Sequence, residues 1–267
     1  MIQPPHNNRL QRTALRAAAE PERSATKSSV GADMNPQHYL FVDDRALGVC
    51  VFCGGVPDTR DHVPSKVFVD DPLPDHLPIV EACEACNQGF SLDEEYLACF
   101  LEAVLAGSTD PEKLTRAKIK RALSRNARLV SRLEASVRVD DNGTMIWIPE
   151  ANRVQNVVRK LARGHAAYEL SLPEIDEPAA VTFQPFLTMS EQARQRFENA
   201  GSGELRGWPE IGSRAFLRAC GADPYSDTVG PWIEVQRGRY RYSVGQDAGV
   251  IVRIVIAEYL ACEVAWE

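Results

Sequence analysis

Apolar residues recur at helical spacing in three stretches of the chain. The first stretch begins near Cys83, ends at Gly107, and carries apolar side chains at Phe90, Leu97, Phe100, Leu101 and Val104. This spacing predicts a helix over about 83–107. Asp110 and Pro111 form a typical N-cap and first turn, and they predict a second helix over about 111–135. A third helix is predicted over about 151–170.

The rest of the chain is typical of strands and turns. Strands are expected at about 181–183, 232–235, 240–244 and 250–255, the last continuing toward Trp266. Arg237-Gly238 between the second and third of these strands predicts an antiparallel hairpin. A short surface helix is expected over about 190–200, followed by a break at Gly201-Ser202-Gly203. Before the first helix, Gly54-Gly55 and several prolines predict tight turns and one short hairpin over about 45–82.

These elements predict an α+β protein in three parts. Residues 1–40 are rich in Arg, Ala, Ser, Pro and Asn without apolar periodicity, so we expect a disordered tail. Residues 41–107 hold the turns, the short hairpin and the first helix. Residues 108–267 form a C-terminal part with helices and an antiparallel sheet, whose role the sequence does not define.

Composition narrows the class of protein. An apolar content of 44% is ordinary for a globular protein. The formal net charge of −7 argues against a protein that coats nucleic acid through overall positive charge. No stretch approaches the roughly 20 apolar residues of a membrane-spanning helix, and the first 30 residues lack the apolar core of a secretory signal. We expect a cytoplasmic protein with no membrane partner, and its oligomeric state, a homodimer included, stays open.

Four of the seven cysteines form two C-x-x-C pairs, Cys50 with Cys53 and Cys83 with Cys86. Two such pairs about 30 residues apart in a non-secreted chain predict a structural Zn²⁺ site with four thiolate ligands. Four reduced core cysteines are the alternative, but glycines and the polar Glu84 flank them. A thioredoxin-like redox site would need a βαβ context that this region lacks.

Polar residues suited to phosphodiester hydrolysis lie between and next to these pairs. Asp61 and Asn87 offer hard oxygen ligands for Mg²⁺ or Mn²⁺. In an extended segment His62 points to the opposite face from Asp61, so it has a different role. A neutral imidazole suits it to take a proton from an attacking water molecule.

The stretches C-V-F-C-G, T-R-D-H-V-P-S-K and A-C-E-A-C-N-Q-G-F-S occur in this order over about residues 48–100. Together they resemble the HNH endonuclease superfamily, in its subgroup whose ββα-metal fold carries two C-x-x-C pairs. The resemblance implies that Cys50, Cys53, Cys83 and Cys86 bind zinc. It also implies that Asp61 and Asn87 hold the catalytic cation and that His62 is the general base.

One position departs from this family pattern. Members usually carry an Asn, followed by Leu, seven residues before the third cysteine, where its amide orients the loop of the base. This chain has His76 followed by Leu77. His76 is therefore a candidate to brace the catalytic loop in place of Asn, or to be a third ligand of the cation.

Basic residues supply candidate contacts to nucleic acid. Arg60 and Lys66 flank the Asp61-His62 pair. The segment from Lys113 to Arg132 carries eight basic residues and no acidic residue. Four of the eight are our main candidates for phosphate contacts: Lys118, Arg121, Arg125 and Arg128. Recurring positive side chains on helices neutralise phosphates without reading sequence. The alternative is a solvated face that balances nearby acidic residues.

The sequence therefore predicts a metal-dependent HNH endonuclease, a hydrolase that cleaves DNA phosphodiester bonds. The resemblance implies that residues 41–107 form its zinc-stapled, treble-clef-like nuclease module. The alternative from another class is a non-catalytic, zinc-stabilised module that binds nucleic acid or protein and has a degenerate HNH site. The triad of Asp61, His62 and Asn87 favours catalysis, whereas His76 favours degeneration. A structural protein with an incidental zinc site is a third interpretation.

Overall fold

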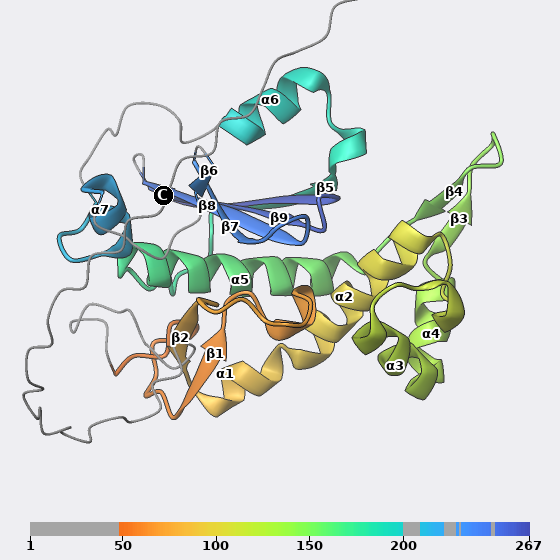
Figure 1. Cartoon of the computed structure of the whole chain (residues 1–267), viewed down its shortest axis with the longest axis horizontal. Helices are drawn as coiled ribbons and strands as arrows, with labels where there is room; N and C mark the ends of the chain where they lie inside the picture. The colour runs from red at the N-terminus through yellow and green to blue at the C-terminus, as the bar shows by residue number, and fades with distance from the viewer. Residues whose placement is uncertain (1–47, 200–208, 222–227, 230, 247–248) are drawn as a thin grey trace, which may run out of the picture. The chain divides into compact units, whose positions relative to one another are not determined.

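A computed structural model describes residues 48–199, 209–221, 228–229, 231–246 and 249–267 (Figure 1). The expected tail over 1–40 and the break at 201–203 lie outside the described residues. The helices are α1 (Glu84–Gly89), α2 (Ser91–Ala106), α3 (Ala117–Arg125), α4 (Ala127–Glu134), α5 (Ala151–Leu170), α6 (Glu191–Asn199) and α7 (Arg214–Ala219). The strands are β1 (Thr59–His62), β2 (Ile79–Ala82), β3 (Val137–Val139), β4 (Met145–Trp147), β5 (Ala180–Pro185), β6 (Thr228–Val229), β7 (Trp232–Gln236), β8 (Tyr240–Gln246), β9 (Val250–Ile256) and β10 (Leu260–Trp266).

The mixture of helices with a C-terminal antiparallel sheet confirms that part of the predicted fold class. Six strands pair in the order β5-β10-β9-β8-β7-β6, and every neighbouring pair is antiparallel. The hairpin expected around Arg237-Gly238 is the pair β7–β8, and Gly238 there has a φ of 72°. Two small antiparallel hairpins, β1–β2 and β3–β4, stand apart from this sheet.

The single helix predicted over 111–135 is wrong. A 3-10 turn at Pro111–Lys113 is followed by an extended segment and then by α3 and α4. The Glu102 carboxylate accepts the backbone N–H groups of Thr115 and Arg116, both at 3.1 Å. Asn126 caps α4 by accepting the Leu129 N–H at 3.0 Å. Side-chain oxygens thus accept backbone N–H groups that, in a continuous helix, would have donated to backbone carbonyls of the helix itself.

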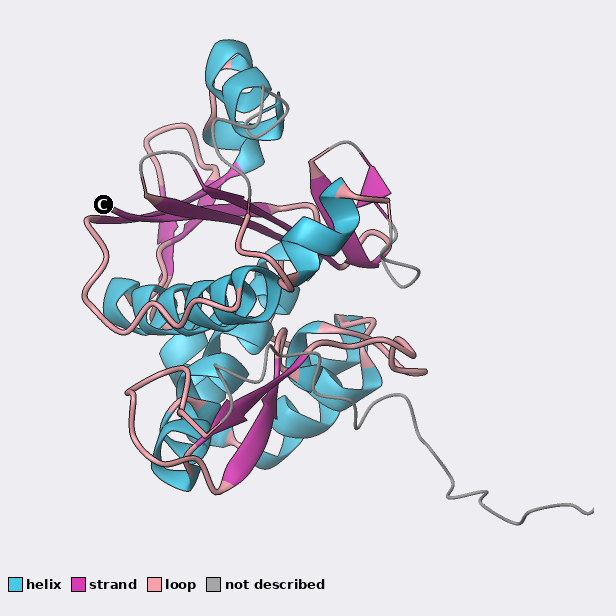
Figure 2. Cartoon of the chain, turned by 90° about the vertical axis from the view of Figure 1, so that its left-hand side faces the viewer, coloured by secondary structure: helices cyan, strands magenta, loops and turns pink. Residues whose placement is uncertain are grey.

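The long α5, predicted over the same residues, packs between the six-stranded sheet and the N-terminal hairpin and helices (Figure 2). It contacts β9, β10, β8 and β5 on one side, and α2 and β2 on the other. At Gly164 an added Cβ would lie 2.5 Å from a methyl group of Val63, directly after β1. A glycine is therefore needed where α5 approaches the chain that carries the candidate catalytic pair.

Alternation along the strands gives the sheet two buried faces. Val252 and Ile254 of β9 belong to the main core with α5, whereas Val255 packs on the other face with Phe197 of α6 and with Trp232. Figure 1 shows α5 and α6 on opposite sides of the sheet. The main core also includes residues of α2, β2 and the segment after β1, so α5 connects the hairpin region to the sheet through one continuous core.

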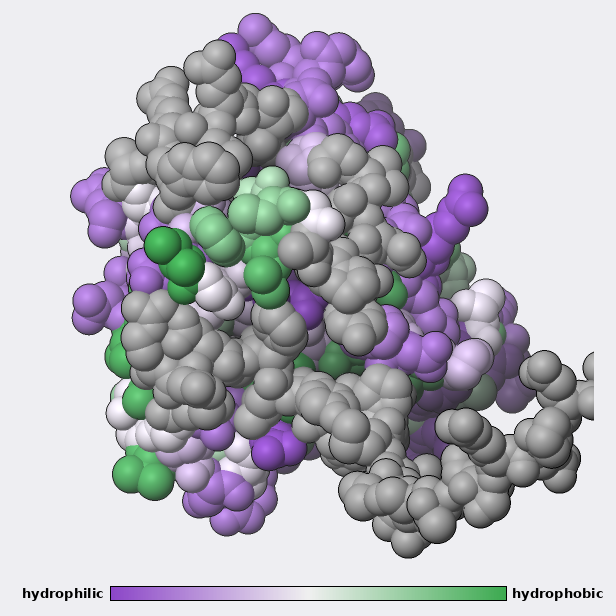
Figure 3. All heavy atoms as spheres, turned by 60° about the vertical axis from the view of Figure 1, so that its left-hand side comes forward, coloured by the Kyte–Doolittle hydropathy of each residue, from purple (hydrophilic) through white to green (hydrophobic). Residues whose placement is uncertain are grey.

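Hydrophilic residues predominate among the coloured residues of the face in Figure 3, and hydrophobic residues gather in an area left of its centre. Val56, Leu187 and Ile211 are exposed large apolar side chains that are distant from one another in sequence. A second group of exposed apolar residues lies together on or directly after the β3–β4 hairpin: Val139, Met145, Ile146 and Ile148. Single exposed apolar residues are normal on folded proteins.

Candidate functional site

The four cysteines come together at the base of the β1–β2 hairpin. The sulfur atoms of Cys50, Cys53, Cys83 and Cys86 all lie within 4.8 Å of one another, and those of Cys53 and Cys83 are 3.8 Å apart. Sulfur ligands about 2.3 Å from a tetrahedral Zn²⁺ lie about 3.8 Å from each other. The cluster therefore fits a structural metal ion of this size.

Local backbone geometry supports this four-cysteine cluster. In the first pair, the Gly54 N–H donates to the Cys50 carbonyl at 2.8 Å, in a turn where Gly54 has a φ of 74°. In the second pair, Cys83 caps the N-terminus of α1 and its sulfur accepts the Cys86 N–H at 3.4 Å. That N–H group lowers the pKa of the Cys83 thiol, while burial raises the pKa of Cys50 and Cys86. A bound cation would offset the cost of ionising these thiols.

The predicted catalytic residues lie on the hairpin and helix that this cluster joins. Asp61 and His62 end β1, paired with Val80 and Ile79 of β2. Asn87 lies on α1, and its amide nitrogen is 3.3 Å from Thr59 Oγ1 and 3.2 Å from the Arg60 carbonyl. Asn87 is therefore bonded to β1 just before Asp61, so the structure brings all three predicted residues into one small unit.

The Asp61 carboxylate already has a cationic partner. The ammonium of Lys160, on α5, lies 2.6 Å from Asp61 Oδ2, 2.5 Å from Glu94 Oε1 and 2.8 Å from Ser65 Oγ. The Lys160 side chain is 0% exposed, and those of Asp61 and Glu94 are 10% exposed. Burial raises the pKa of Asp61, and the charge of Lys160 opposes that shift. We call these four residues the lysine cluster.

This arrangement does not fit a divalent cation on Asp61. A cation bound to the carboxylate at ~2.1 Å would lie within about 5 Å of the ammonium, where their repulsion costs about 7 kcal/mol at an effective dielectric constant of ~20. Within the described part of the chain, the four-cysteine cluster is the one group of three or more His, Cys, Asp or Glu side chains close enough together to hold a metal ion. Neither Asp61 nor His76 belongs to it.

His62 lies on the other face of β1. It shares that face with Arg60, because side chains two residues apart on a strand point the same way. His62 is partly exposed and its Nδ1 atom is buried, so Nε2 is the ring nitrogen that can face solvent. Lys66 is exposed on the loop that follows. The partly exposed imidazole is thus accompanied by basic residues.

His76 is exposed on the loop between the two strands of the hairpin. It lines a cleft of about 280 Å³ together with Tyr168, Arg214, Glu234 and Tyr242. The cleft opens between this loop and the C-terminal sheet. That His76 braces the loop of the base stays a prediction.

The basic stretch divides into structural and exposed residues. Arg116 is buried, 2.6 Å from Asp70, and donates to the carbonyls of Val67 and Val69. Lys118 donates to the carbonyls of Lys66 and Val69. Both therefore hold the loop after β1 against α3. Three of the predicted phosphate contacts, by contrast, are exposed on α3 and α4: Arg121, Arg125 and Arg128.

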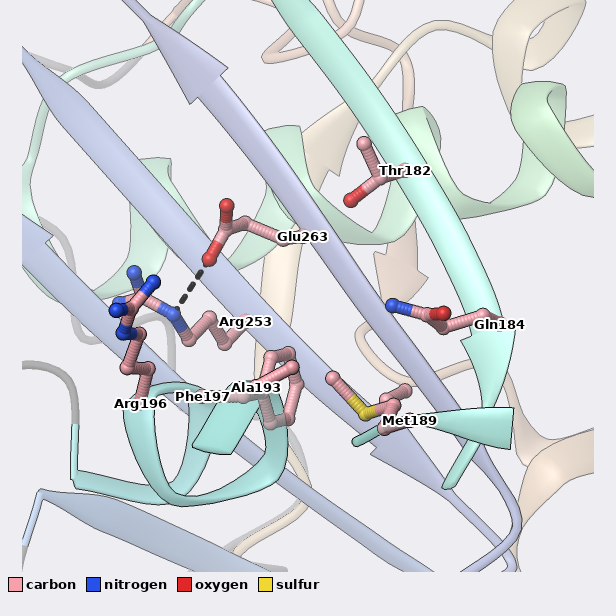
Figure 4. Close-up of a pocket in the computed structure, with 9 residues that line it drawn as sticks. Thr182, Gln184, Met189, Ala193, Arg196, Phe197, Arg253 and Glu263 are labelled. Carbon is pink, nitrogen blue, oxygen red and sulfur yellow. Dashed lines mark ion pairs between the residues drawn. The ribbon is translucent and has the colours of Figure 1, made fainter. Parts of the chain in front are cut away.

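A second cleft, of about 250 Å³, lies between α6 and the strands β5, β9 and β10 (Figure 4). Arg253 Nε is 2.7 Å from Glu263 Oε2, and Arg196 of α6 lies beside them. By strand alternation these residues lie on the face opposite α5. This cleft is therefore separated by the sheet from the lysine cluster.

No family model matches this chain, and neither the curated proteins nor the solved structures include a match to it. Among the described residues, no helix has the length and apolar character needed to cross a membrane. The site must therefore be interpreted from its own geometry.

The roles of Lys160 and Glu94 were not predicted from the sequence, and both residues are buried. A signal for Lys160 does exist. It lies three residues after Val157 and four before Gly164, on the stripe of α5 that is buried. A cation on such a stripe requires a buried carboxylate partner, but the sequence does not say which one.

Proposed function

We propose that this protein is an HNH-type endonuclease that hydrolyses phosphodiester bonds of DNA at His62. The observation that carries the proposal is the compact hairpin-and-helix unit in which His62 and Asp61 end β1, Asn87 is bonded to β1 from α1, and the four-cysteine cluster joins the elements. This combination agrees with the ββα organisation that the sequence motifs imply. A zinc ion with four thiolate ligands has no open position, so its role is to hold the unit together.

The reaction then uses residues on the exposed face of β1. His62 Nε2 takes a proton from a water molecule, whose oxygen attacks the phosphorus. The bond from phosphorus to the leaving sugar oxygen breaks, and that oxygen takes a proton from solvent. Arg60 and Lys66 are placed to offset the negative charge that grows on the phosphate oxygens.

A second candidate function is a non-catalytic module that binds nucleic acid. The observation in its favour is the contact of Lys160 with Asp61, because a buried ion pair removes the carboxylate from metal chemistry. The exposed arginines of α3 and α4 are compatible with either function, since phosphate binding does not require turnover.

Incubation of the zinc-loaded protein with supercoiled plasmid, with and without added Mg²⁺ or Mn²⁺, separates the two functions. We expect nicking by the wild-type protein, loss of at least about 100-fold in rate for His62→Ala, and no change for the exposed control Arg237→Gln. Equal cleavage by wild type and His62→Ala would contradict the proposal. Retention of the plasmid in a gel-shift experiment without cleavage would favour the binding module.

A further inference from the structure

The Lys160 ammonium is buried among polar partners. It donates to Glu94 Oε1 at 2.5 Å and to Ser65 Oγ at 2.8 Å, and it forms an ion pair with Asp61 Oδ2 at 2.6 Å. Three oxygen atoms therefore surround a group that has three N–H donors. The Ser65 hydroxyl donates in turn to Glu94.

Two aromatic rings complete the enclosure. The ammonium lies 5.7 Å from the ring centroid of Phe52 and 5.8 Å from that of Phe90. Phe52 belongs to the first C-x-x-C pair, and Phe90 lies between α1 and α2. Both distances are within the range of a cation–π contact. The lysine therefore binds to the same elements that the zinc site holds together.

The charges of the lysine cluster also show why the ammonium stays there. Asp61 and Glu94 carry two carboxylates, both nearly buried, and Lys160 supplies the cation between them. Without that cation the two carboxylates would face each other in a region of low dielectric constant, which strongly favours a positive occupant. This is the electrostatic requirement that a divalent cation meets in a metal-dependent nuclease.

We infer that the ammonium of Lys160 occupies, in this protein, the place that the HNH resemblance assigns to a divalent cation, so that Asp61 does not bind Mg²⁺ or Mn²⁺. The inference rests on the proposed function for its choice of Asp61 as the expected ligand. Asp61 then positions α5 against β1 through Lys160, and any hydrolysis by His62 proceeds without a metal ion at Asp61.

Binding of Mn²⁺ to the full-length, zinc-loaded protein tests this inference directly. The unbound ion is quantified by electron paramagnetic resonance, and bound Mn²⁺ is located by its broadening of amide signals in nuclear magnetic resonance spectra. We expect the wild-type protein and the exposed control Asp141→Asn to show no saturable Mn²⁺ site near β1. Saturable binding to the wild type that broadens the signals of Asp61 and Val80 would overturn the inference, and this measurement needs no variant to fold.

Removal of the ammonium should create a metal site. Lys160→Met keeps much of the side-chain length without the charge, and we expect it to bind one Mn²⁺ per chain. The double variant Lys160→Met/Asp61→Asn should lose that site. A folded Lys160→Met variant that gains no Mn²⁺ would show that the ammonium is not what excludes the cation. This experiment measures Mn²⁺ binding, whereas the plasmid experiment measures cleavage, so the two proposals can fail separately. A wild-type protein that neither cleaves DNA nor binds Mn²⁺ near β1 would contradict only the proposed nuclease function. A wild-type protein that cleaves DNA and binds Mn²⁺ at Asp61 would contradict only this inference.

Discussion

His165 is a buried histidine of α5 whose surroundings fix its charge. It is 0% exposed, its Nε2 lies 2.8 Å from the Tyr240 hydroxyl, and its ring stacks on Tyr242 at 3.7 Å. Burial, with a smaller contribution from the charge of Lys160, lowers its pKa well below 6.5. His165 is therefore neutral in the folded protein at any pH near neutrality.

This neutrality predicts a pH-dependent stability. In the unfolded chain the histidine takes up a proton as the pH falls below about 6.5, while the folded protein keeps it neutral. The folded state is therefore favoured above that pH and loses up to about 1.4 kcal/mol per pH unit below it. Urea unfolding between about pH 7 and pH 5 should show a shallower decline for His165→Gln than for the wild type. Parallel declines would contradict the assignment.

Single residues also show where sequence reasoning ends. The sequence predicted that the four cysteines meet, because two C-x-x-C pairs at this separation are typical of one four-thiolate metal site. The structure confirms that their sulfur atoms lie close together. The partner of Asp61 could not. Lys160 lies 99 residues further along the chain, and only the packing of α5 against β1, through Gly164, brings the two together.

At the scale of elements, apolar periodicity predicted α5 over residues 151–170, where the structure has it. The same periodicity did not predict the places where a helix or a strand ends and the chain turns. Asn126 looks like an ordinary helix-surface residue, yet it caps α4 and ends the predicted long helix. The expected strand from 250 toward Trp266 turns back at Ala257 and Glu258, with φ of 57° and 48°. Neither residue type signals a left-handed turn, so the division into β9 and β10 could not be predicted from the sequence.

The exposed arginines of α3 and α4 give a prediction at this scale. Replacement of Arg121, Arg125 and Arg128 by Gln should weaken DNA binding and lower the slope of log K against log salt by about 0.9 for each lost phosphate contact. Arg237→Gln, an exposed change in the β7–β8 turn, is the matched control and should leave both values unchanged. Fluorescence anisotropy over a salt series measures the slope. An unchanged slope in the triple variant would show that these three arginines do not contact phosphate.

At the scale of the whole molecule, α5 makes the hairpin region and the sheet depend on each other. Its residues belong to one core that includes both β2 and β9. We therefore expect loss of zinc to destabilise all of the described structure rather than the hairpin alone.

Zinc removal tests this dependence. If the ion contributes about 4 kcal/mol, Tm should fall by roughly 8–16 °C, as a single transition in calorimetry. Cys53→Ser should reproduce the fall, whereas Cys220→Ser, an exposed cysteine outside the cluster, should not. A sheet that melts at its original temperature after zinc is removed would show that the two regions are independent.

The guanidinium of Arg163 connects the first C-x-x-C turn to the end of the sheet. It donates to the Phe52 carbonyl at 3.3 Å and to the Asp176 carbonyl at 2.9 Å, and the Trp266 indole N–H donates to that same Asp176 carbonyl at 3.1 Å. An indole whose hydrogen bond depends on this chain of contacts changes its emission when the contacts loosen. Trp266 should therefore act as a natural optical indicator of metal occupancy, readable without any added dye.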